Sequence, residues 1–563
     1  MKSIVFSIAK SVLIFVVLLA CGGLLQAQST NRQIGTQFTV TADPLVPRPH
    51  VQPCIAPLFT NYQFALFSET NQTFNFAPPA QCSGPWQKVV LAINFSENAG
   101  VQFDRTATLY LANTNLYFGT TPEPLRNATN TWHVERDVTD YSSLFKTDQQ
   151  GTFVLQNCTG QDCGSAFSFL NGVFTVSAQL EFYPASGHGV APRTPDLVLP
   201  VTQSNGSGGV NLPIFLTLPP NDVSTAFNLP TNIEEAYLDV IAQSQQVDEQ
   251  WYACFPNDLS NINLLYGCGN TDFRETEVSI DGQPAGIAPV SPWVFTGFLP
   301  DQWVPIPGVQ TLDFVPYRVN LTPFAGILSN GQPHTITLSV FDQNYYFALS
   351  GSLLLYLDHD SAQVTGNVIQ NTLSSPSPIV SENLQGTSTV TGTIDVSQKR
   401  NFTIAGYVNT SHGRTTTSVS QAQNFSGTQS IDFDVVNQSV LDQNTTVKNT
   451  VNSLTTSFGR DGLRLTSQSF SFPISVDVVL PASNSEFGLT VVTKQDYHSS
   501  KLVLHNGRIE DFSSVDNSAA ASDVSPTSSS QHYTFFELGT RPYDCEIASA
   551  NNTLTKVSSG CSQ

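Results

Sequence analysis

The stretch TATLYLANTNLYFG, residues 106–119, alternates apolar and polar side chains with a period of two. Successive side chains of a β-strand point to opposite faces, so this alternation predicts a strand with one buried face. The same period recurs in GVFTVSAQLEFYP (172–184), EEAYLDVIAQS (234–244) and HTITLSVFD (334–342). Helical periodicity is almost absent, and Gly, Pro and Asn separate the segments. We therefore predict an all-β protein built of antiparallel β-sandwiches.

Proline-rich segments divide these strand patterns into parts. Residues 28–200 are predicted to form an N-terminal β-sandwich, residues 201–230 a Pro-rich linker, and residues 231–362 a second β-sandwich. From residue 363 to residue 563 the composition shifts to Ser, Thr and Asn, which predicts a C-terminal polar β domain. Within that domain, the Ser/Ala-rich residues 513–530 are predicted to be a flexible loop.

The first 27 residues have the features of a secretory signal peptide. Lys2 and Lys10 precede or flank an apolar run at residues 11–20, and a cleavage pattern, Leu25-Gln26-Ala27, follows. The run is shorter than the ~20 apolar residues that a membrane span needs. An uncleaved signal anchor is the alternative. We expect a secreted protein, extracellular or within the secretory pathway.

Eight cysteines lie outside the signal segment, an even number that suits disulfides in an oxidising compartment. Neighbour pairing is the simplest arrangement because each bridge closes a short loop, but the sequence leaves the connectivity open. A zinc site is the rival interpretation, although the chain has no Cys-x-x-Cys. The neighbour pairs are Cys54 with Cys82, Cys158 with Cys163, Cys254 with Cys268, and Cys545 with Cys561.

Twelve Asn-x-Ser/Thr acceptor sequences also suit a secreted glycoprotein. We predict N-glycosylation at Asn71, Asn94, Asn127, Asn157, Asn205, Asn320, Asn401, Asn409, Asn424, Asn437, Asn444 and Asn551.

Charge narrows the range of partners. The chain carries 23 basic and 44 acidic residues, a formal net charge of −21 at pH 7. Phosphate groups repel such a surface, so we expect neither nucleic-acid binding nor attachment to a membrane. A charged fraction of only 12% with many Ser, Thr, Asn and Gln residues favours a neutral polar ligand.

A charge pair, Asp104-Arg105, stands at the head of the alternating stretch. If the alternation extends back to this pair, Arg105 shares a face with Ala107 and Leu109, while Asp104 shares the polar face with Thr106. Asp104 is then expected at a strand mouth, beside groups able to hold a hydroxylated ligand. The alternative is a strand-end Asp that accepts backbone N–H bonds, with Arg105 covering the sheet.

Several blocks around this pair resemble the plant and fungal peptide N-glycosidase A family, in order and in spacing, from about residue 50 to 360. A weaker likeness extends to the flavobacterial peptide N-glycosidase, which is built of two jelly rolls with its active site where they meet. The resemblance therefore implies two adjoining jelly-roll-like β-sandwiches. The blocks are VQFDRTATLYL (101–111), TTPEP (120–124), WHVERDVTDYSSLF (132–145), NIEEAYLDVIAQSQQVDEQWY (232–252), TDFRETEVSIDGQPAG (271–286), SPWVFTGFLPDQWVPI (291–306) and VNLTPFAGILSNGQPHTITLSV (319–340).

The resemblance implies an amidase that cleaves the bond between Asn and GlcNAc of N-glycopeptides or denatured N-glycoproteins, without cofactor or metal. Asp104 matches the catalytic aspartate of that family, and Arg105 the arginine beside it. The second functional acid of the bacterial enzyme falls on Asn270, which cannot ionise. Either the second acid is dispensable or another carboxylate replaces it, and Asp248, Glu249, Asp272 and Glu275 are the nearest in sequence. We favour Glu249.

In this scheme Asp104 acts as a general base on water, and the Arg105 guanidinium clamps the substrate or the developing oxyanion. Both can reach one site only if Asp104 lies at a strand end or a bulge. The expected substrate-binding residues are Asp248, Trp251, Asn270, Arg274 and Glu123.

Two other classes of function stay open from the sequence. A glycan-binding β-sandwich could have kept the fold and lost the chemistry, as Asn270 would allow. A glycosidase with two carboxylates on a β scaffold is the other. The products separate all three, because only an amidase converts the glycosylated Asn to Asp and releases the glycan intact.

Overall fold

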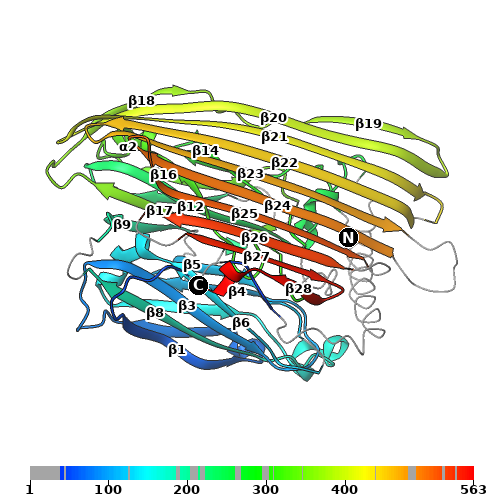
Figure 1. Ribbon diagram of the computed structural model, residues 1–563. Helices are drawn as coiled ribbons and strands as arrows, with labels where there is room; N and C mark the ends of the chain where they lie inside the picture. Colours follow the sequence, from blue (N-terminus) through cyan, green and yellow to red (C-terminus); the bar gives the residue numbers. More distant parts are fainter. Residues whose placement is uncertain are drawn as a thin grey trace.

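The computed structural model consists almost entirely of antiparallel strands (Figure 1). Two β-sandwiches adjoin each other, and one large sheet covers them. The predicted signal peptide and Asn205 lie outside the described residues, and among the described residues no helix is long and apolar enough to cross a membrane. The described residues are 39–43, 46–124, 127–185, 191–202, 214–215, 222–259, 268–294, 304–308, 310–344, 346–437, 439–479, 490–522, 527–538 and 542–562.

The first sandwich packs two four-stranded sheets, with strand orders β1-β8-β3-β6 and β2-β7-β4-β5. Burial alternates along β8, as the period of two predicts, and the inward side chains form an aromatic core that includes Phe64, Phe153 and Phe182. The strands are β1 (Cys54–Phe64), β2 (Asn71–Phe76), β3 (Trp86–Glu97), β4 (Thr106–Leu111), β5 (Thr114–Thr120), β6 (Asn130–Asp137), β7 (Gln149–Leu155) and β8 (Phe174–Pro184).

The second sandwich joins a sheet of order β10-β17-β12-β15, with β9 paired to β17, to a sheet of order β11-β16-β13-β14. Its strands are β9 (Leu197–Val201), β10 (Ile214–Phe215), β11 (Val223–Phe227), β12 (Ile233–Gln245), β13 (Glu275–Ile280), β14 (Gln283–Pro289), β15 (Tyr317–Asn320), β16 (His334–Val340) and β17 (Tyr346–Leu357). The predicted boundaries at residues 200 and 231 are therefore wrong. β9 begins before the expected linker, yet it pairs with β17 of the second sandwich. β11 lies inside the expected linker, yet it pairs with β16.

Helical segments are short and lie between strands. They are η2 (Phe67–Glu69), η3 (Thr139–Lys146), η4 (Gly160–Cys163), η5 (Ser165–Phe167), η6 (Gln246–Asp248), η7 (Trp251–Ala253), η10 (Thr322–Phe324), α2 (Ala325–Leu328) and η11 (Ser559–Ser562).

The C-terminal part is one eleven-stranded sheet, whose long strands run side by side in Figure 1. The expected loop at residues 513–530 is wrong in large part, because β25 and β26 occupy most of it. The strands are β18 (Thr365–Asn371), β19 (Ile379–Gln385), β20 (Thr389–Thr410), β21 (Gly413–Asp434), β22 (Ser439–Gly459), β23 (Gly462–Val479), β24 (Thr490–His505), β25 (Arg508–Ser522), β26 (Ser528–Glu537), β27 (Tyr543–Ala550) and β28 (Thr553–Val557).

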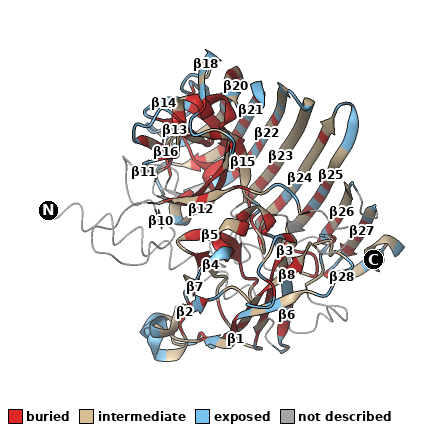
Figure 2. Cartoon of the chain, turned by 90° about the vertical axis from the view of Figure 1, so that its left-hand side faces the viewer, coloured by how far each residue is buried: buried red, intermediate tan, exposed pale blue. Residues whose placement is uncertain are grey.

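This large sheet is attached to the sandwiches rather than standing as a separate domain. Burial alternates along β20 and β21, which gives the banded colouring in Figure 2. The buried face continues the core of the second sandwich, where Phe425 meets Phe273 with 5.0 Å between ring centroids. At the far end of the sheet, Cys545 and Ile547 pack against Ala42. The alternation of small polar and apolar residues thus gives the large sheet one apolar face, which is buried against the rest of the molecule, and one polar face.

The seam between the two sandwiches is closely bonded. Arg318 donates to Asp239 (2.7 Å) and to Asp140 (2.6 Å), and the Tyr141 hydroxyl donates to Asp239 (2.9 Å). Phe118 and Phe314 meet edge to face at 5.5 Å. Charged hydrogen bonds and packed rings therefore hold the sandwiches together where η3 and β5 of the first meet β12, β15 and Phe314 of the second. A jelly-roll connectivity within each sandwich stays a prediction.

All four disulfides join neighbouring cysteines, so the simplest of the predicted pairings is confirmed. Nine of the acceptor asparagines are exposed, and Asn320 is half-buried. The prediction for Asn157 is wrong for the folded chain. Its carboxamide is fully buried and donates to the carbonyl oxygens of Phe64 (2.8 Å) and Gly172 (3.0 Å), so it has no room for a glycan.

Candidate active site at the seam of the sandwiches

Asp104 and Arg105 lie in residues 101–105, directly before β4 begins at Thr106. They are therefore not part of the strand, and the alternation of faces does not apply to them. The loop beyond β5 runs alongside, because the Arg105 N–H donates to Thr121 Oγ1 (2.9 Å) and the Thr121 N–H donates to the Arg105 carbonyl (2.8 Å). This places the half-buried Glu123 near the charge pair, as the sequence suggested.

A buried glutamine fixes the loop that carries the pair. Gln102 donates from Nε2 to the carbonyl oxygens of Cys158 (2.9 Å) and Gly172 (3.2 Å). Its Oε1 accepts from the Phe103 N–H (3.0 Å) and from Arg105 Nη2 (2.8 Å). Since Cys158 is bonded to Cys163, a covalently closed loop supports the guanidinium through one carboxamide.

Arg105 is surrounded by more negative charge than it can balance. Burial lowers the pKa of its guanidinium, while Asp104, Glu97 and Glu123 act in the opposite direction. The guanidinium carbon also lies 5.9 Å from the centre of the Phe103 ring. Three carboxyl groups from three segments of the first sandwich thus meet one guanidinium, which is typical of a site for acid–base chemistry.

Glu97 is a member of this cluster that the sequence did not reveal. It is the last residue of β3, and its side chain is fully buried. Burial raises the pKa of its carboxyl well above the usual range, and the charges of Glu123 and Asp104 add to the effect against Arg105. In sequence, a glutamate at a strand end looks like an ordinary surface acid. Glu97 is distinguished from a surface acid only in the folded chain, where Asp104 lies close enough to affect its pKa.

The second sandwich contributes Glu249, which follows β12 and the short helix η6. Its half-buried carboxyl has a pKa well above the usual range, because burial disfavours the charge and Asp104 repels it. Two hydrogen bonds tie the end of β12 to the first sandwich, from Gln243 Nε2 to Thr120 Oγ1 (3.0 Å) and from Gln245 Nε2 to Thr106 Oγ1 (3.2 Å). Asp104 and Glu249 therefore influence each other across the seam.

The backbone of Glu249 is held from within its own sandwich. Trp293 donates from Nε1 to Ser244 Oγ (3.0 Å), and Ser244 donates in turn to the Glu249 carbonyl oxygen (3.2 Å). Trp293 is itself buried against Phe314 at the seam. The same apolar contact that joins the sandwiches therefore also positions the acid.

Asp248 and Arg274 do not belong to the site, which corrects their assignment to substrate binding. Both side chains are fully buried and form an ion pair at 3.3 Å. Both oxygens of Asp248 accept the Asn344 N–H at 3.0 Å, and Arg274 Nη1 donates to the carbonyl oxygens of Phe273 and Thr271. Arg274 Nη2 also donates to the Gly269 carbonyl oxygen (3.4 Å), next to the Cys254–Cys268 disulfide, so the role of the pair is structural.

Trp251 and Asn270 are also placed differently from the prediction. Trp251 is fully buried in the core of the second sandwich, so it offers no platform to a sugar. Asn270 has a positive φ of 60° and exchanges two hydrogen bonds with Asn257 (2.8 and 3.0 Å). Its carbonyl accepts from Arg274 (3.1 Å), which joins it to the structural ion pair.

The remaining candidates for the second acid face the large sheet. Glu275 forms an ion pair with Arg400 of β20, and Asp272 packs against Gly427 of β21. Both carboxyls are fully buried at that interface, where burial raises the pKa of each to about 8. Of the acids considered, Glu249 is the one whose charge is coupled to Asp104.

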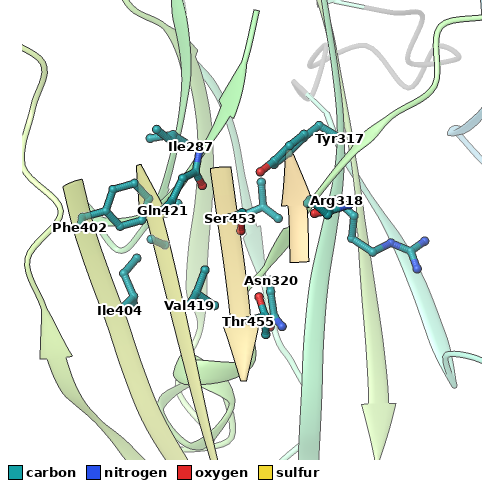
Figure 3. Close-up of a pocket in the computed structure, with 14 residues that line it drawn as sticks. Ile287, Tyr317, Arg318, Asn320, Phe402, Ile404, Val419, Gln421, Ser453 and Thr455 are labelled. Atoms are coloured by element: carbon teal, nitrogen blue, oxygen red, sulfur yellow. The ribbon is translucent and has the colours of Figure 1, made fainter. Parts of the chain in front are cut away.

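A cavity between the second sandwich and the large sheet is separate from this cluster. In Figure 3, Tyr317, Asn320 and Ile287 face Gln421, Ser453 and Thr455 across it. Its volume of about 30 Å³ suits one water molecule, and no member of the Asp104 cluster lines it. Among the described residues no group of three or more His, Cys, Asp and Glu side chains could hold a metal ion.

The comparisons with known proteins point to one family. The family model described as "Peptide N-acetyl-beta-D-glucosaminyl asparaginase amidase A" matches residues 44–374, more than half of the chain. "Peptide-N4-(N-acetyl-beta-glucosaminyl)asparagine amidase A" of Prunus dulcis is 28% identical over 432 residues, which is 72% of each chain.

Two solved structures are similar at a lower level. PNGase F, a glycosylasparaginase from Flavobacterium meningosepticum, has a TM-score of 0.34 and 17% identity, covering 54% of this chain and 96% of that one. PNGF-II has a TM-score of 0.38 and 14% identity, covering 55% and 66%. Similarity of this degree does not by itself assign an activity.

Proposed function

This chain belongs to the peptide N-acetyl-beta-D-glucosaminyl asparaginase amidase A family, and we infer that it hydrolyses the amide bond between Asn and GlcNAc of N-glycopeptides. The family match covers both sandwiches, which are the parts that supply Asp104 and Glu249. The products are an intact glycan bearing a glycosylamine and a peptide in which Asp replaces Asn.

One observation supports the assignment of residues within that activity. Two carboxyl groups from opposite sandwiches interact at the seam. The charge of Arg105 is coupled to that of Asp104, whereas burial and the charge of Asp104 raise the pKa of Glu249 well above its usual range. A protonated carboxyl beside an ionised one is the arrangement that a general acid and a general base require.

The proposed reaction uses each of these groups once. Asp104 removes a proton from water, and the water oxygen bonds to the amide carbon of the glycosylated Asn. The charge of Arg105 stabilises the developing oxyanion. Glu249 gives its proton to the amide nitrogen as the carbon–nitrogen bond breaks, which releases the glycosylamine. Because Arg105 Nη2 is held by Gln102, the guanidinium acts through its charge more than as a two-pronged clamp.

The test is incubation of the purified protein with a defined glycopeptide, followed by mass spectrometry of both products. The wild type is expected to give the intact glycan and the Asp peptide, and Asp104→Asn is expected to lose at least about 100-fold in rate. A shortened glycan would identify a glycosidase, and bound glycopeptide without product a binding protein. Full activity of Asp104→Asn would refute the role of Asp104.

We also propose that glycopeptides and denatured glycoproteins are better substrates than folded glycoproteins. Asp104, Arg105 and Glu249 are half-buried between two sandwiches, so a glycosylated Asn reaches them more easily from a flexible chain than from a folded surface. Rates on one glycoprotein before and after denaturation test this. Equal rates would contradict it.

Secretion is proposed from the N-terminal segment, and four disulfides support it because such bonds persist in oxidising compartments. Expression of the full chain in a eukaryotic secretory host, with mass spectrometry of the medium, tests this. The expected product begins after the signal segment and carries glycans at exposed acceptors such as Asn71 and Asn94. Retention of an unglycosylated chain in the cytosol would refute it.

A further inference from the structure

Glu97 is a buried acid for which the reaction above has no role. Its side chain is 0% exposed, and within the described part of the chain neither carboxyl oxygen has a hydrogen-bond partner. A Cβ on Gly172 would stand 3.3 Å from Glu97 Oε1 and 2.6 Å from the Cβ of Gln102. The carboxyl therefore lies beside Gln102, the residue that holds Arg105 in place.

The charges that face Glu97 come from two other segments of the first sandwich. Asp104 and Arg105 approach from the loop before β4, and Glu123 approaches from the loop after β5. Its partners across the sheet, Asn130 of β6 and Phe174 of β8, are uncharged. Three carboxyls thus share one guanidinium.

An ionised Glu97 in this place would be costly. A buried charge needs both a counter-ion and hydrogen bonds, and removal from water without them is strongly unfavourable. Arg105 is the cation of the cluster, and Asp104 and Glu123 compete for it. The least costly state keeps Glu97 neutral while Asp104 is ionised, in agreement with the raised pKa of its carboxyl.

We propose that Glu97 is a positioning residue which holds a proton. Because the protonated Glu97 carries no charge, the positive charge of Arg105 acts on Asp104 alone of the two. The inference rests on the proposed amidase activity. When Glu97 loses its proton, its carboxylate draws on the charge of Arg105, and both the base and the oxyanion lose part of their stabilisation. Glu97 thus acts through Arg105 without touching the substrate, and its deprotonation at high pH lowers kcat/KM.

The pH dependence of kcat/KM tests this with the whole protein and a defined glycopeptide. Activity requires that both Glu249 and Glu97 keep a proton. On the alkaline side of the pH profile, log(kcat/KM) of the wild type is therefore expected to fall with the steepness that corresponds to the loss of about two protons. In Glu97→Gln position 97 is permanently neutral, so the alkaline limb of its pH profile is expected to have the shallower slope that corresponds to the loss of about one proton. Glu97→Asp keeps an acid and the steeper limb.

Glu277→Gln serves as a matched control. Glu277 is a half-buried acid in the second sandwich whose pKa is also raised, but its neighbours are Arg400 and other acids outside the site. The control is expected to keep the steep limb of the wild type. Equal steepness in the wild type and Glu97→Gln would overturn the proposal, and so would a shallow limb in Glu97→Asp.

Infrared difference spectroscopy gives a second readout that needs no substrate. The wild type minus Glu97→Gln difference at neutral pH is expected to contain the carbonyl band of one protonated carboxylic acid. A carboxylate band in its place would overturn the proposal, even if Glu97→Gln is inactive. If the wild type shows no deglycosylation at all, the proposed function fails, while the spectrum still decides whether Glu97 holds a proton.

Discussion

Asp104 with Arg105 and Asp248 with Arg274 are two acid–arginine pairs whose members the sequence assigned to the same site, and the fold gives the two pairs opposite roles. Asp248 and Arg274 are fully buried, bonded to each other and to the backbone around them. Asp104 and Arg105 are half-buried at the seam, where further carboxyls outnumber the guanidinium. A satisfied pair holds the surrounding backbone in place, whereas a surplus of acids raises the pKa of Glu97 and Glu249 and so supports acid–base chemistry.

The largest expected effect on stability comes from breaking the satisfied pair. Asp248→Asn leaves Arg274 buried without its counter-ion, which is expected to lower the free energy of unfolding by about 3–5 kcal/mol. Denaturant titration measures it. The control is Glu546→Gln, which breaks the exposed pair with Lys556 and should cost less than about 1 kcal/mol. Equal effects would contradict the structural role of Asp248.

The next effect concerns the acid from the second sandwich. Glu249→Gln removes the proton donor, so kcat on a glycopeptide is expected to fall about 100-fold. Because the pKa of Glu249 is raised and its protonated form is the active one, the wild type loses activity as the pH rises through that pKa. Glu277→Gln, a change to an acid outside the site, should leave kcat unaffected. A rate close to wild type in Glu249→Gln would remove Glu249 from the mechanism.

A smaller effect is expected from the support of Arg105. Gln102→Ala removes the acceptor of Arg105 Nη2 and loosens the guanidinium, so kcat is expected to fall about tenfold with little change in KM. Gln179→Ala is the control, because Gln179 bonds Glu181 of its own strand, β8, and neither residue is among the charged groups around Arg105. If both variants kept the wild-type kcat, Gln102 would have no positioning role.

The last predicted effect is a change in how stability depends on pH. Burial against the large sheet raises the pKa of Asp272 to about 8, so between about pH 4 and pH 8 the folded chain binds a proton that the unfolded chain has lost. The free energy of unfolding therefore falls as the pH rises through this window. Asp272→Asn should reduce that slope by up to about 1.4 kcal/mol per pH unit. Denaturant midpoints at several pH values measure it, and an unchanged slope would contradict the burial of a neutral acid there.

Much of the fold could be predicted because its signal is local. A period of two identifies strands, and short separations favour the disulfide pairs that the structure contains. Residues 513–530 failed because Ser and Ala have weak strand preferences, and pairing with β24 and β27 on either side decides their structure. The linker prediction failed for the same reason, since β11 becomes a strand only by pairing with the distant β16.

The site divides along similar lines. Asp104 and Arg105 lie in one recognisable block and Glu123 in the next, and Glu249 was the favoured replacement for the missing acid at Asn270. Burial, however, depends on contacts between residues far apart in the chain. The sequence could not show that Trp251 and Arg274 lie in the core, or that Glu97 lies beside Arg105.

The central claim is that the charge of Asp104 serves catalysis while that of Asp248 serves the fold. The most direct measurement determines kcat and the free energy of unfolding for Asp104→Asn and Asp248→Asn side by side. Asp104→Asn should lose at least about 100-fold in kcat and keep its stability. Asp248→Asn should lose stability, with the turnover of its folded fraction retained. A reversed pattern, or full turnover in Asp104→Asn, would contradict the account.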